Sequence, residues 1–223
     1  MKITEIYSTI QGEGKYVGLP IIVLRTGICN LQCDFCDTKY SWQKEFIPNL
    51  KNISTLKDAD QIINEIEEKR NNINTILLTG GEPMLWQNDY YFGYILNNLM
   101  KNNMKIHVET NGTMKLIKSE LFEYISISPK TTTYFDLYQK EVIETYKNFK
   151  DKIFKFVVGD LTDIISIKNF YRKFEIKDND IWLMPKGTTQ EELQNSLIVI
   201  DKYKDLFDNC SISERRHILL HVR

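Results

Sequence analysis

Several features typical of secreted, membrane-bound or nucleic-acid-binding proteins are missing from this sequence of 223 residues. No apolar run approaches the length of a membrane-spanning helix, and the first residues lack the apolar core of a signal peptide. We therefore expect a cytoplasmic protein without a membrane partner. The formal net charge is only −1, so no overall field attracts nucleic acid, and we expect no nucleic-acid partner. The Arg215-Arg216 pair is interpreted as solvated surface.

Cysteine and histidine are also scarce, with four and three residues. Cys29, Cys33 and Cys36 nevertheless lie within one short segment, and in a reducing compartment such a cluster indicates metal binding or catalysis rather than a disulfide. A closed zinc site needs a fourth ligand, which would be Cys210 or His107. An iron–sulfur cubane held by three cysteines instead leaves one iron open. The cysteines alone leave both possibilities open.

The remaining isolated residues of these types have ordinary interpretations. We expect Cys210 to be a half-buried thiol and His107 to be a core or rim residue of a strand. His217 and His221, in the tail, are candidates for the entrance of a site.

No internal repeat, low-complexity segment or linker divides the chain, so we expect one domain over residues 1–223. Apolar β-branched runs predict strands that alternate with amphipathic helices, and residues 6–15 are interpreted as neither. The predicted strands are 20–27, 74–78, 105–110, 124–128, 153–158 and 180–184. The predicted helices are 56–70, about 92–99, 141–148, 162–173 and 189–207. This alternation predicts parallel strands with right-handed crossovers. Six βα units are too few for a closed barrel of eight strands and predict an α/β protein with a partial (β/α)6 barrel.

Polar residues follow the predicted strands where each one ends. Because parallel strands place their carboxyl ends on one rim, we expect these residues to gather in an active site. They are Arg25 with the three cysteines, Thr79–Glu82, Glu109, Thr110, Ser128, Lys130 and Met184–Gly187. Arg25 either pairs with a nearby carboxylate or binds the carboxylate of a ligand. The glycines at 12 and 14 indicate either a plain turn or a loop whose backbone approaches a ligand.

The Cys-x3-Cys-x2-Cys motif, with Phe35 before its last cysteine, and the later Gly80-Gly81-Glu82-Pro83 segment resemble those of the radical S-adenosylmethionine (SAM) enzymes. Further segments resemble the 7-carboxy-7-deazaguanine synthase family within that superfamily. They are Ser8–Gly14, Arg25, Cys36-Asp37-Thr38, Glu109–Thr113 and Ser128-Pro129-Lys130. The resemblance covers nearly the whole chain and implies a partial (β/α)6 barrel of the radical SAM type.

The resemblance implies that Cys29, Cys33 and Cys36 hold a [4Fe–4S] cluster whose fourth iron binds SAM. An electron from the cluster would cleave SAM to a 5′-deoxyadenosyl radical, so no side chain is assigned as the catalytic residue. The residues implied to bind SAM are Phe35, Asp37, Gly81, Glu82, Ser128, Lys130, Met184, Pro185, Lys186 and Gly187.

The implied substrate is 6-carboxy-5,6,7,8-tetrahydropterin, whose radical ring contraction with loss of ammonia gives 7-carboxy-7-deazaguanine for queuosine and related bases. Its implied contacts are Ile10, Gln11, Gly12, Arg25 and Thr79, and Thr38 is the implied protein ligand of Mg²⁺. Because one hydroxyl is a poor magnesium site, water and substrate oxygens would complete the coordination. The resemblance also implies a homodimer reduced by flavodoxin or ferredoxin.

The sequence departs from the family pattern in Ser211–His217, where a Pro-Gln or Gln-Thr is expected before the histidine. Two alternatives follow. Another radical SAM enzyme, such as a glycyl-radical activase, would share the cysteines and Gly80–Pro83 but would not predict Gln11–Gly14, Arg25 and Thr38. A non-catalytic zinc-binding module would need a fourth ligand and no SAM pocket.

Overall fold

Strands and helices alternate along the computed structural model, which describes residues 1–220. The strands are β1 (Lys2–Ile10), β2 (Pro20–Thr26), β3 (Lys51–Asn52), β4 (Thr75–Gly80), β5 (Lys105–Thr110), β6 (Tyr124–Ile127), β7 (Lys152–Val158), β8 (Ile181–Pro185) and β9 (Ser211–Ile212). The helices are α1 (Leu56–Glu68), α2 (Tyr90–Lys101), α3 (Thr131–Tyr134), α4 (Lys140–Lys147), α5 (Leu161–Phe174), α6 (Gln190–Tyr203) and α7 (Arg216–Leu219). The chain folds into two compact units. The first comprises Met1–Thr9, Pro20–Thr110 and Leu116–Ile125, and the second Ile10–Leu19, Asn111–Lys115 and Ser126–Arg223.

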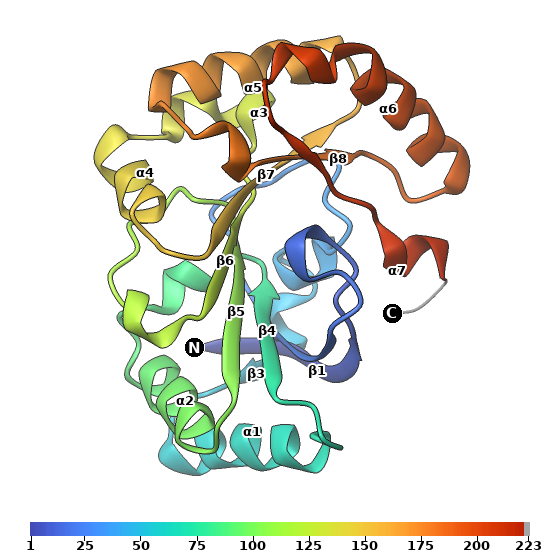
Figure 1. Ribbon diagram of the computed structural model, residues 1–223. Coiled ribbons are helices and arrows are strands. Elements are labelled where there is room, and N and C mark those ends of the chain that lie inside the picture. The colour runs from blue at the N-terminus through green and yellow to red at the C-terminus, as the bar shows by residue number, and fades with distance from the viewer. Residues whose placement is uncertain (221–223) are drawn as a thin grey trace. The chain divides into compact units, whose positions relative to one another are not determined.

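The first unit is built on strands in the order β3-β1-β2-β4-β5. β2 pairs in parallel with β4 and β4 with β5, and this register places Arg25 beside Thr79 and Thr26 beside Gly80. Because the strands are parallel, their polar carboxyl ends lie at one edge of this sheet. In Figure 1, α1 and α2 lie next to each other in this unit.

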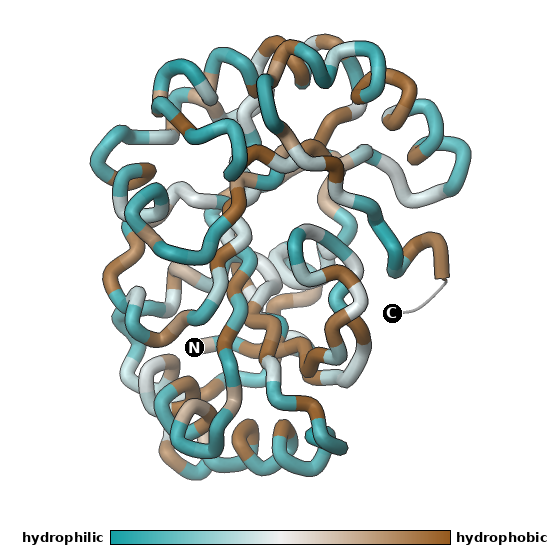
Figure 2. Tube along the Cα trace, in the orientation of Figure 1, coloured by the Kyte–Doolittle hydropathy of each residue, from teal (hydrophilic) through white to brown (hydrophobic). Residues whose placement is uncertain are grey.

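The helices of the first unit follow from local sequence. Thr55 and Asp58 form a capping box at the start of α1, since each side chain accepts a hydrogen bond from the other residue's backbone N–H. Ala59, Ile62 and Ile66 then form the buried stripe of the helix. Figure 2 shows the resulting alternation of hydrophilic and hydrophobic residues along the tube.

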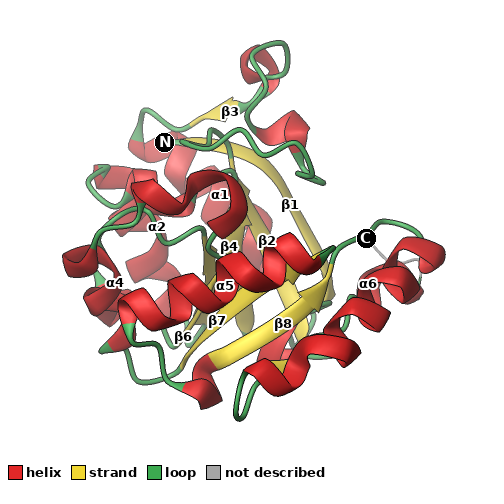
Figure 3. Ribbon diagram, turned by 90° about the horizontal axis from the view of Figure 1, so that it is seen from above, coloured by secondary structure: helices red, strands yellow, loops and turns green. Residues whose placement is uncertain are grey.

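The second unit contains the parallel strands β7, β8 and β9. Figure 3 shows α5 and α6 beside the strands of this unit. Phe170 of α5 is fully buried, and its ring contacts those of Phe156, Phe174 and Tyr138 at centroid distances of 5.7, 4.5 and 5.1 Å. These aromatic contacts form the core between α5 and β7.

The structure confirms the predicted strands and helices, whose bounds differ by a few residues at their ends. The interpretation of residues 6–15 was wrong in its first half, because β1 continues to Ile10. Glu5 and Tyr7 of this strand bond to Arg25 rather than facing solvent, so the usual alternation of apolar and polar residues is masked. In the tail, residues 211–212 pair with β8, whereas Leu219 and Leu220 are exposed. The single domain over residues 1–223 stays a prediction. Within residues 1–220, none of the helices combines the length and apolarity needed to cross a bilayer.

Candidate active site

The three clustered cysteines lie in the loop that follows β2, here called the cysteine loop (Gly27–Thr38). Ile28, directly before Cys29, has a positive φ of 70°, a conformation that β-branched residues rarely adopt. The backbone N–H of Leu31 points at the sulfur of Cys29 at 3.4 Å, and the indole N–H of Trp42 at that of Cys36 at 3.3 Å. Donors aimed at cysteine sulfurs stabilise thiolates and tune the potential of a bound cluster.

The segment Gly80–Pro83, here called the β4 bend, fixes the start of the cysteine loop. The N–H of Gly81 donates to the carbonyl of Thr26 at 3.0 Å, and that of Glu82 to the carbonyl of Ile28 at 2.8 Å. A Cβ on Gly81 would lie 1.9 Å from the Ile28 oxygen, so only glycine permits this approach. Local sequence at two strand ends thus positions the cysteine loop.

Glu82 is a buried carboxylate beside the cysteine loop, with 1% of its surface exposed. Its Oε1 accepts hydrogen bonds from the hydroxyl of Thr110 at 2.7 Å and the N–H of Met84 at 2.9 Å. Burial, followed by the negative charges of Glu82 and the other two cysteines, raises the pKa of the Cys29 thiol to about 11, although the Leu31 N–H opposes this. A cationic centre would relieve this accumulation of negative charge.

The cysteine loop fits an iron–sulfur cubane better than a single metal ion. Within residues 1–220, no group of three or more His, Cys, Asp or Glu side chains is arranged to hold one ion. In a cubane each cysteine binds a different iron, so the sulfurs stand further apart than the ligands of one ion. Three cysteines, two of which receive N–H donors, lie near a buried carboxylate and beside Phe35, which is 37% exposed, and this arrangement suits a cluster that must also contact a small cofactor.

Arg25, at the end of β2, is held by the first strand of the same unit. Its Nε donates to Glu5 at 2.7 Å and its Nη2 to the hydroxyl of Tyr7 at 3.1 Å, while the hydroxyl of Tyr40 donates to the same Glu5 oxygen at 2.7 Å. Burial alone would lower the pKa of Arg25, but Tyr40, Tyr7 and Glu5 together raise it, so the guanidinium stays charged. Arg25 is therefore paired with the Glu5 carboxylate, one of the two roles predicted for it. This pair fixes the plane of the guanidinium, which has five N–H donors.

Other predicted site residues of the first unit lie close to this loop in sequence or at strand ends. The hydroxyl of Thr79, at the end of β4, donates to Glu109 of β5 at 3.1 Å. The hydroxyl of Thr38 lies 3.6 Å from the sulfur of Cys36, while its carbonyl accepts the Ser41 N–H and hydroxyl at 2.9 and 2.8 Å. Asp37 precedes Thr38 in the same loop. The Thr38 hydroxyl thus lies beside a cysteine sulfur.

The remaining predicted site residues belong to the second unit. Gln11 and Gly12 lie in the loop after β1, where the Gln11 N–H donates to Leu19 and the Gln11 carbonyl accepts from Gly18, each at 2.8 Å. Ile10 ends β1, and the Lys130 ammonium donates to the Ser128 hydroxyl at 2.8 Å. The bend Met184–Gly187 follows β8, and the carbonyl of Lys186 accepts from Ser196 at 2.6 Å. That all predicted site residues line one rim stays a prediction.

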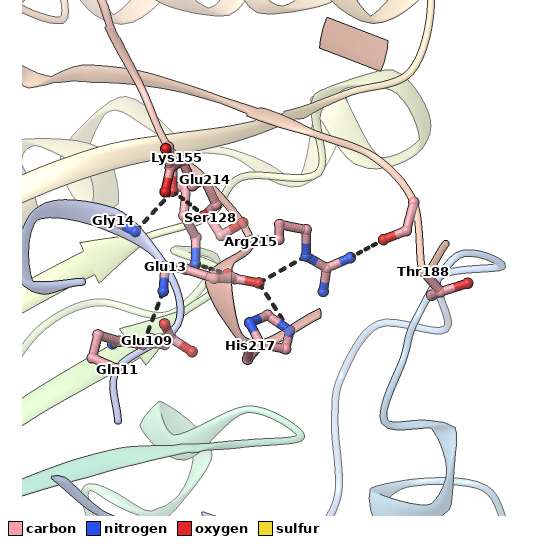
Figure 4. A network of polar contacts seen from close by, with 12 residues as sticks. Gln11, Glu13, Gly14, Glu109, Ser128, Lys155, Thr188, Glu214, Arg215 and His217 are labelled. Carbon is pink, nitrogen blue, oxygen red and sulfur yellow. Dashed lines mark hydrogen bonds and ion pairs between the residues drawn. The ribbon is translucent and has the colours of Figure 1, made fainter. Parts of the chain in front are cut away.

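Sequence reasoning missed a buried charge cluster in the second unit, centred on Glu13 (Figure 4). Its carboxylate pairs with Lys155 of β7 at 2.5 Å and with Nε of Arg215 at 2.9 Å. Burial raises the pKa of Glu13, but Lys155, Arg215 and His217 outweigh it and hold that pKa far below its usual value. The interpretation of Arg215 as solvated surface was wrong, because its side chain is 9% exposed, whereas that of Arg216 is 45% exposed. The sequence feature that could have indicated this buried cluster is Lys155, a lysine within the apolar run 153–158.

The isolated histidines and the last cysteine have ordinary surroundings. His107 is 2% exposed and its ring contacts that of Tyr124 at 5.2 Å, as expected for a core residue. Cys210 is partly buried, and burial raises the pKa of its thiol. His217 lies 3.9 Å from Glu13, and His221 lies outside the described residues.

Several known proteins are similar to this chain. Residues 23–167 match the radical SAM superfamily. A 7-carboxy-7-deazaguanine synthase from Buchnera aphidicola subsp. Schizaphis graminum is 33% identical over 203 residues, which cover 86% of this chain and 87% of that relative. The synthase from Rickettsia prowazekii is 37% identical over 137 residues, covering 58% of this chain and about half (51%) of the relative.

Among solved structures, QueE from Escherichia coli has a TM-score of 0.70 at 21% identity, covering 97% of this chain and 94% of that structure. At this identity the likeness shows the fold alone. It confirms, with the superfamily match, the predicted α/β class of the partial (β/α)6 barrel.

Proposed function

This chain belongs to the radical SAM superfamily and, within it, to the 7-carboxy-7-deazaguanine synthase family, and on this premise we propose the reaction that it catalyses. A [4Fe–4S] cluster and SAM are the cofactors of the superfamily, and the enzyme acts on a small-molecule substrate with electrons from a reductant. We propose that the substrate is 6-carboxy-5,6,7,8-tetrahydropterin and that the product, formed with loss of ammonia, is 7-carboxy-7-deazaguanine for 7-deazapurine and queuosine synthesis. Residues 1–223 would act as one domain.

The observation that supports this proposal most is the attachment of the cysteine loop to the β4 bend. Cys29, Cys33 and Cys36 would hold the cluster, which when bound to SAM supplies the radical chemistry. The chain's own contribution is to fix the loop through the Gly81 and Glu82 N–H groups, to exclude water by burying Cys33, and to aim N–H donors at two sulfurs. The zinc-module alternative has no support in the family match.

Two sets of residues would bind SAM. In the first unit, the buried Glu82 carboxylate would attract the SAM amino group, next to Gly81, Phe35 and Asp37. The second unit would contribute Ser128, Lys130 and Met184–Gly187. The Lys130 ammonium, held by the Ser128 hydroxyl at 2.8 Å, suits the SAM carboxylate or ribose.

Arg25 would hold the substrate carboxylate, with Ile10, Gln11, Gly12 and Thr79 contacting the pterin. Lysine keeps the charge but lacks the planar fork that binds a carboxylate with two hydrogen bonds. Arg25→Lys should therefore raise the KM for substrate on the order of tenfold while leaving SAM affinity and iron content unchanged. A matched control is Arg70→Lys, because Arg70 makes a surface pair with Glu67 at 3.2 Å. An equal KM in both variants would rule out this role of Arg25.

Thr38 would be the protein ligand of Mg²⁺, and substrate oxygens and water would complete its coordination. Its backbone is anchored by Ser41, so its hydroxyl is held beside Cys36 at 3.6 Å. The rate of product formation by the wild-type enzyme should rise on addition of Mg²⁺, and Thr38→Ala should weaken that response. The rate is measured over a magnesium titration in both proteins, and an unchanged magnesium dependence in the variant would count against Thr38.

The remaining partners are also part of the proposal. A flavodoxin or ferredoxin would deliver the electron, two copies of the chain would form a homodimer, and the enzyme would work in the cytoplasm. Size-exclusion chromatography with light scattering tests the dimer.

An anaerobic assay with SAM, a chemical reductant and carboxytetrahydropterin tests the function. We expect 7-carboxy-7-deazaguanine and ammonia in equal amounts. SAM cleavage without this product would favour another radical SAM activity, such as a glycyl-radical activase. A fully iron-loaded protein that gave neither this product nor SAM cleavage would overturn the proposal.

A further inference from the structure

The Gln11–Gly14 loop is attached to the tail, residues 211–217, by several contacts that lie within the second unit. The N–H of Gly14 donates to the Ser213 hydroxyl at 2.8 Å, and the N–H of Arg216 donates to the carbonyl of Gly12 at 2.9 Å. A Cβ on Gly12 would lie 2.2 Å from Nδ1 of His217, so the loop packs tightly on the tail. The tail therefore sets the backbone of the loop to which we assigned substrate contacts.

Arg215 of the same tail connects this loop to the bend after β8. Its Nε donates to Glu13 at 2.9 Å, and its Nη1 donates to the carbonyl of Gly187 at 2.6 Å (Figure 4). Gly187 has a φ of +151°, and a Cβ there would lie 2.6 Å from Cβ of Glu192, so its backbone is closely confined. One guanidinium thus spans two segments that are assigned to different ligands.

The balance of buried charge indicates that this cluster does more than stabilise the fold. One carboxylate faces two cations, and the side chains of Glu13, Lys155 and Arg215 are 14%, 4% and 9% exposed. The cost of removing buried ions from water offsets most of their mutual attraction. Well-packed apolar residues in place of such ions would often stabilise a protein equally. What apolar residues cannot do is fix two backbone segments by directional hydrogen bonds.

We propose that Glu13 and Arg215 are positioning residues that hold the Gln11–Gly14 loop and the Met184–Gly187 bend in one fixed arrangement, so that the sites for substrate and SAM are set together. This inference rests on the proposed function, since that function assigns the two segments to the two ligands. Neither residue needs to touch either ligand. Lys155 supplies the second cation that keeps the Glu13 carboxylate ionised and oriented.

Arg215→Lys separates positioning from charge, because lysine keeps the positive charge but cannot bridge Glu13 and Gly187 with a planar fork. Without SAM or substrate, backbone hydrogen exchange should speed up on the order of tenfold in residues 11–19 and 186–188. In the iron-loaded enzyme, the Kd for SAM and the KM for substrate should both rise, on the order of tenfold, because small misplacements weaken aligned contacts. Glu13→Gln should change the same quantities, and the double variant should not exceed the larger single effect.

The matched control is Lys152→Met. This variant breaks a comparable ion pair on β7, the strand that also carries Lys155. Lys152 lies 3.0 Å from Asp180, and its side chain is 9% exposed. This control should lower the melting temperature without changing exchange in the two segments or either affinity. If Arg215→Lys behaves like Lys152→Met, the cluster is structural only and the inference fails. If exchange and the Kd for SAM change as expected but wild type makes no deazaguanine, the proposed function fails and the positioning role stands.

Discussion

Replacing Cys33 by alanine is expected to give a colourless protein that neither cleaves SAM nor forms product. Cys33 is the buried one of the three clustered cysteines, and its removal leaves only the thiols of Cys29 and Cys36 in the loop. Two cysteines cannot hold a cubane that already has one iron without a protein ligand. Because the cluster and SAM carry the radical chemistry, no side chain can compensate. Activity should therefore fall to background rather than decrease by a modest factor.

The measurement is iron and sulfide content after anaerobic reconstitution, together with the visible spectrum and the SAM-cleavage rate. Cys210→Ala is the matched control, because Cys210 is a partly buried thiol outside the loop. The control should keep wild-type iron content, colour and turnover. A Cys33→Ala protein that retained four irons per chain, or that bound one tight zinc in place of a cluster, would contradict the assignment.

The elements that the sequence predicts best are those whose signal is local. The run 20–24 is apolar and β-branched, and α1 carries both a capping box and a buried stripe, so each element can be read from its own residues. The whole of β1 was missed because its polar residues bond to another side chain: Glu5 and Tyr7 bond to Arg25. β3 has only two residues, too few to show any period.

The same distinction applies to the candidate site. The cysteine spacing and Gly80–Pro83 are short motifs, and the structure places them in contact through backbone hydrogen bonds. The pair between Glu13 and Arg215 joins residues 202 positions apart, and no pattern within either segment indicates the other. The sequence does place Lys155 in the middle of an apolar strand, and the structure shows that this cation is buried and therefore needs a partner carboxylate.

The two predicted roles of Arg25, a pair with a protein carboxylate and the binding of a ligand carboxylate, are compatible with each other. The sequence left open whether it pairs with a protein carboxylate or binds a ligand. The structure contains the pair with Glu5, and the side chain is 13% exposed. A guanidinium that is fixed in this way loses less entropy when it binds a second carboxylate. The pair therefore supports, rather than replaces, the proposed role in substrate binding.

Replacing Gly81 by alanine is expected to destabilise the protein and to lower its iron content. The new Cβ would meet the carbonyl oxygen of Ile28 at 1.9 Å and its carbon at 2.4 Å, and both are backbone atoms that cannot rotate away. Either the β4 bend or the cysteine loop must move, and overpacking of this kind costs about 3 kcal/mol. For a chain of this size the melting temperature should fall by about 6–12 °C. Because Cys29 follows Ile28, the iron content after reconstitution should fall as well.

Gly93→Ala is the matched control, because it adds the same methyl group to the same unit. Gly93 lies inside α2, where the nearest atom to a new Cβ is the end of the flexible Lys118 side chain at 3.1 Å. Alanine is favoured over glycine in a helix by about 1 kcal/mol, so this variant should melt about 2–4 °C higher with unchanged iron content. If the melting temperature falls in Gly81→Ala and rises in Gly93→Ala, the loss of stability is not a general effect of adding a methyl group to this unit. If Gly81→Ala melted and bound iron like wild type, the β4 bend would not hold the cysteine loop in place, and the cluster site would have to be stabilised by Trp42 and the loop's own contacts instead.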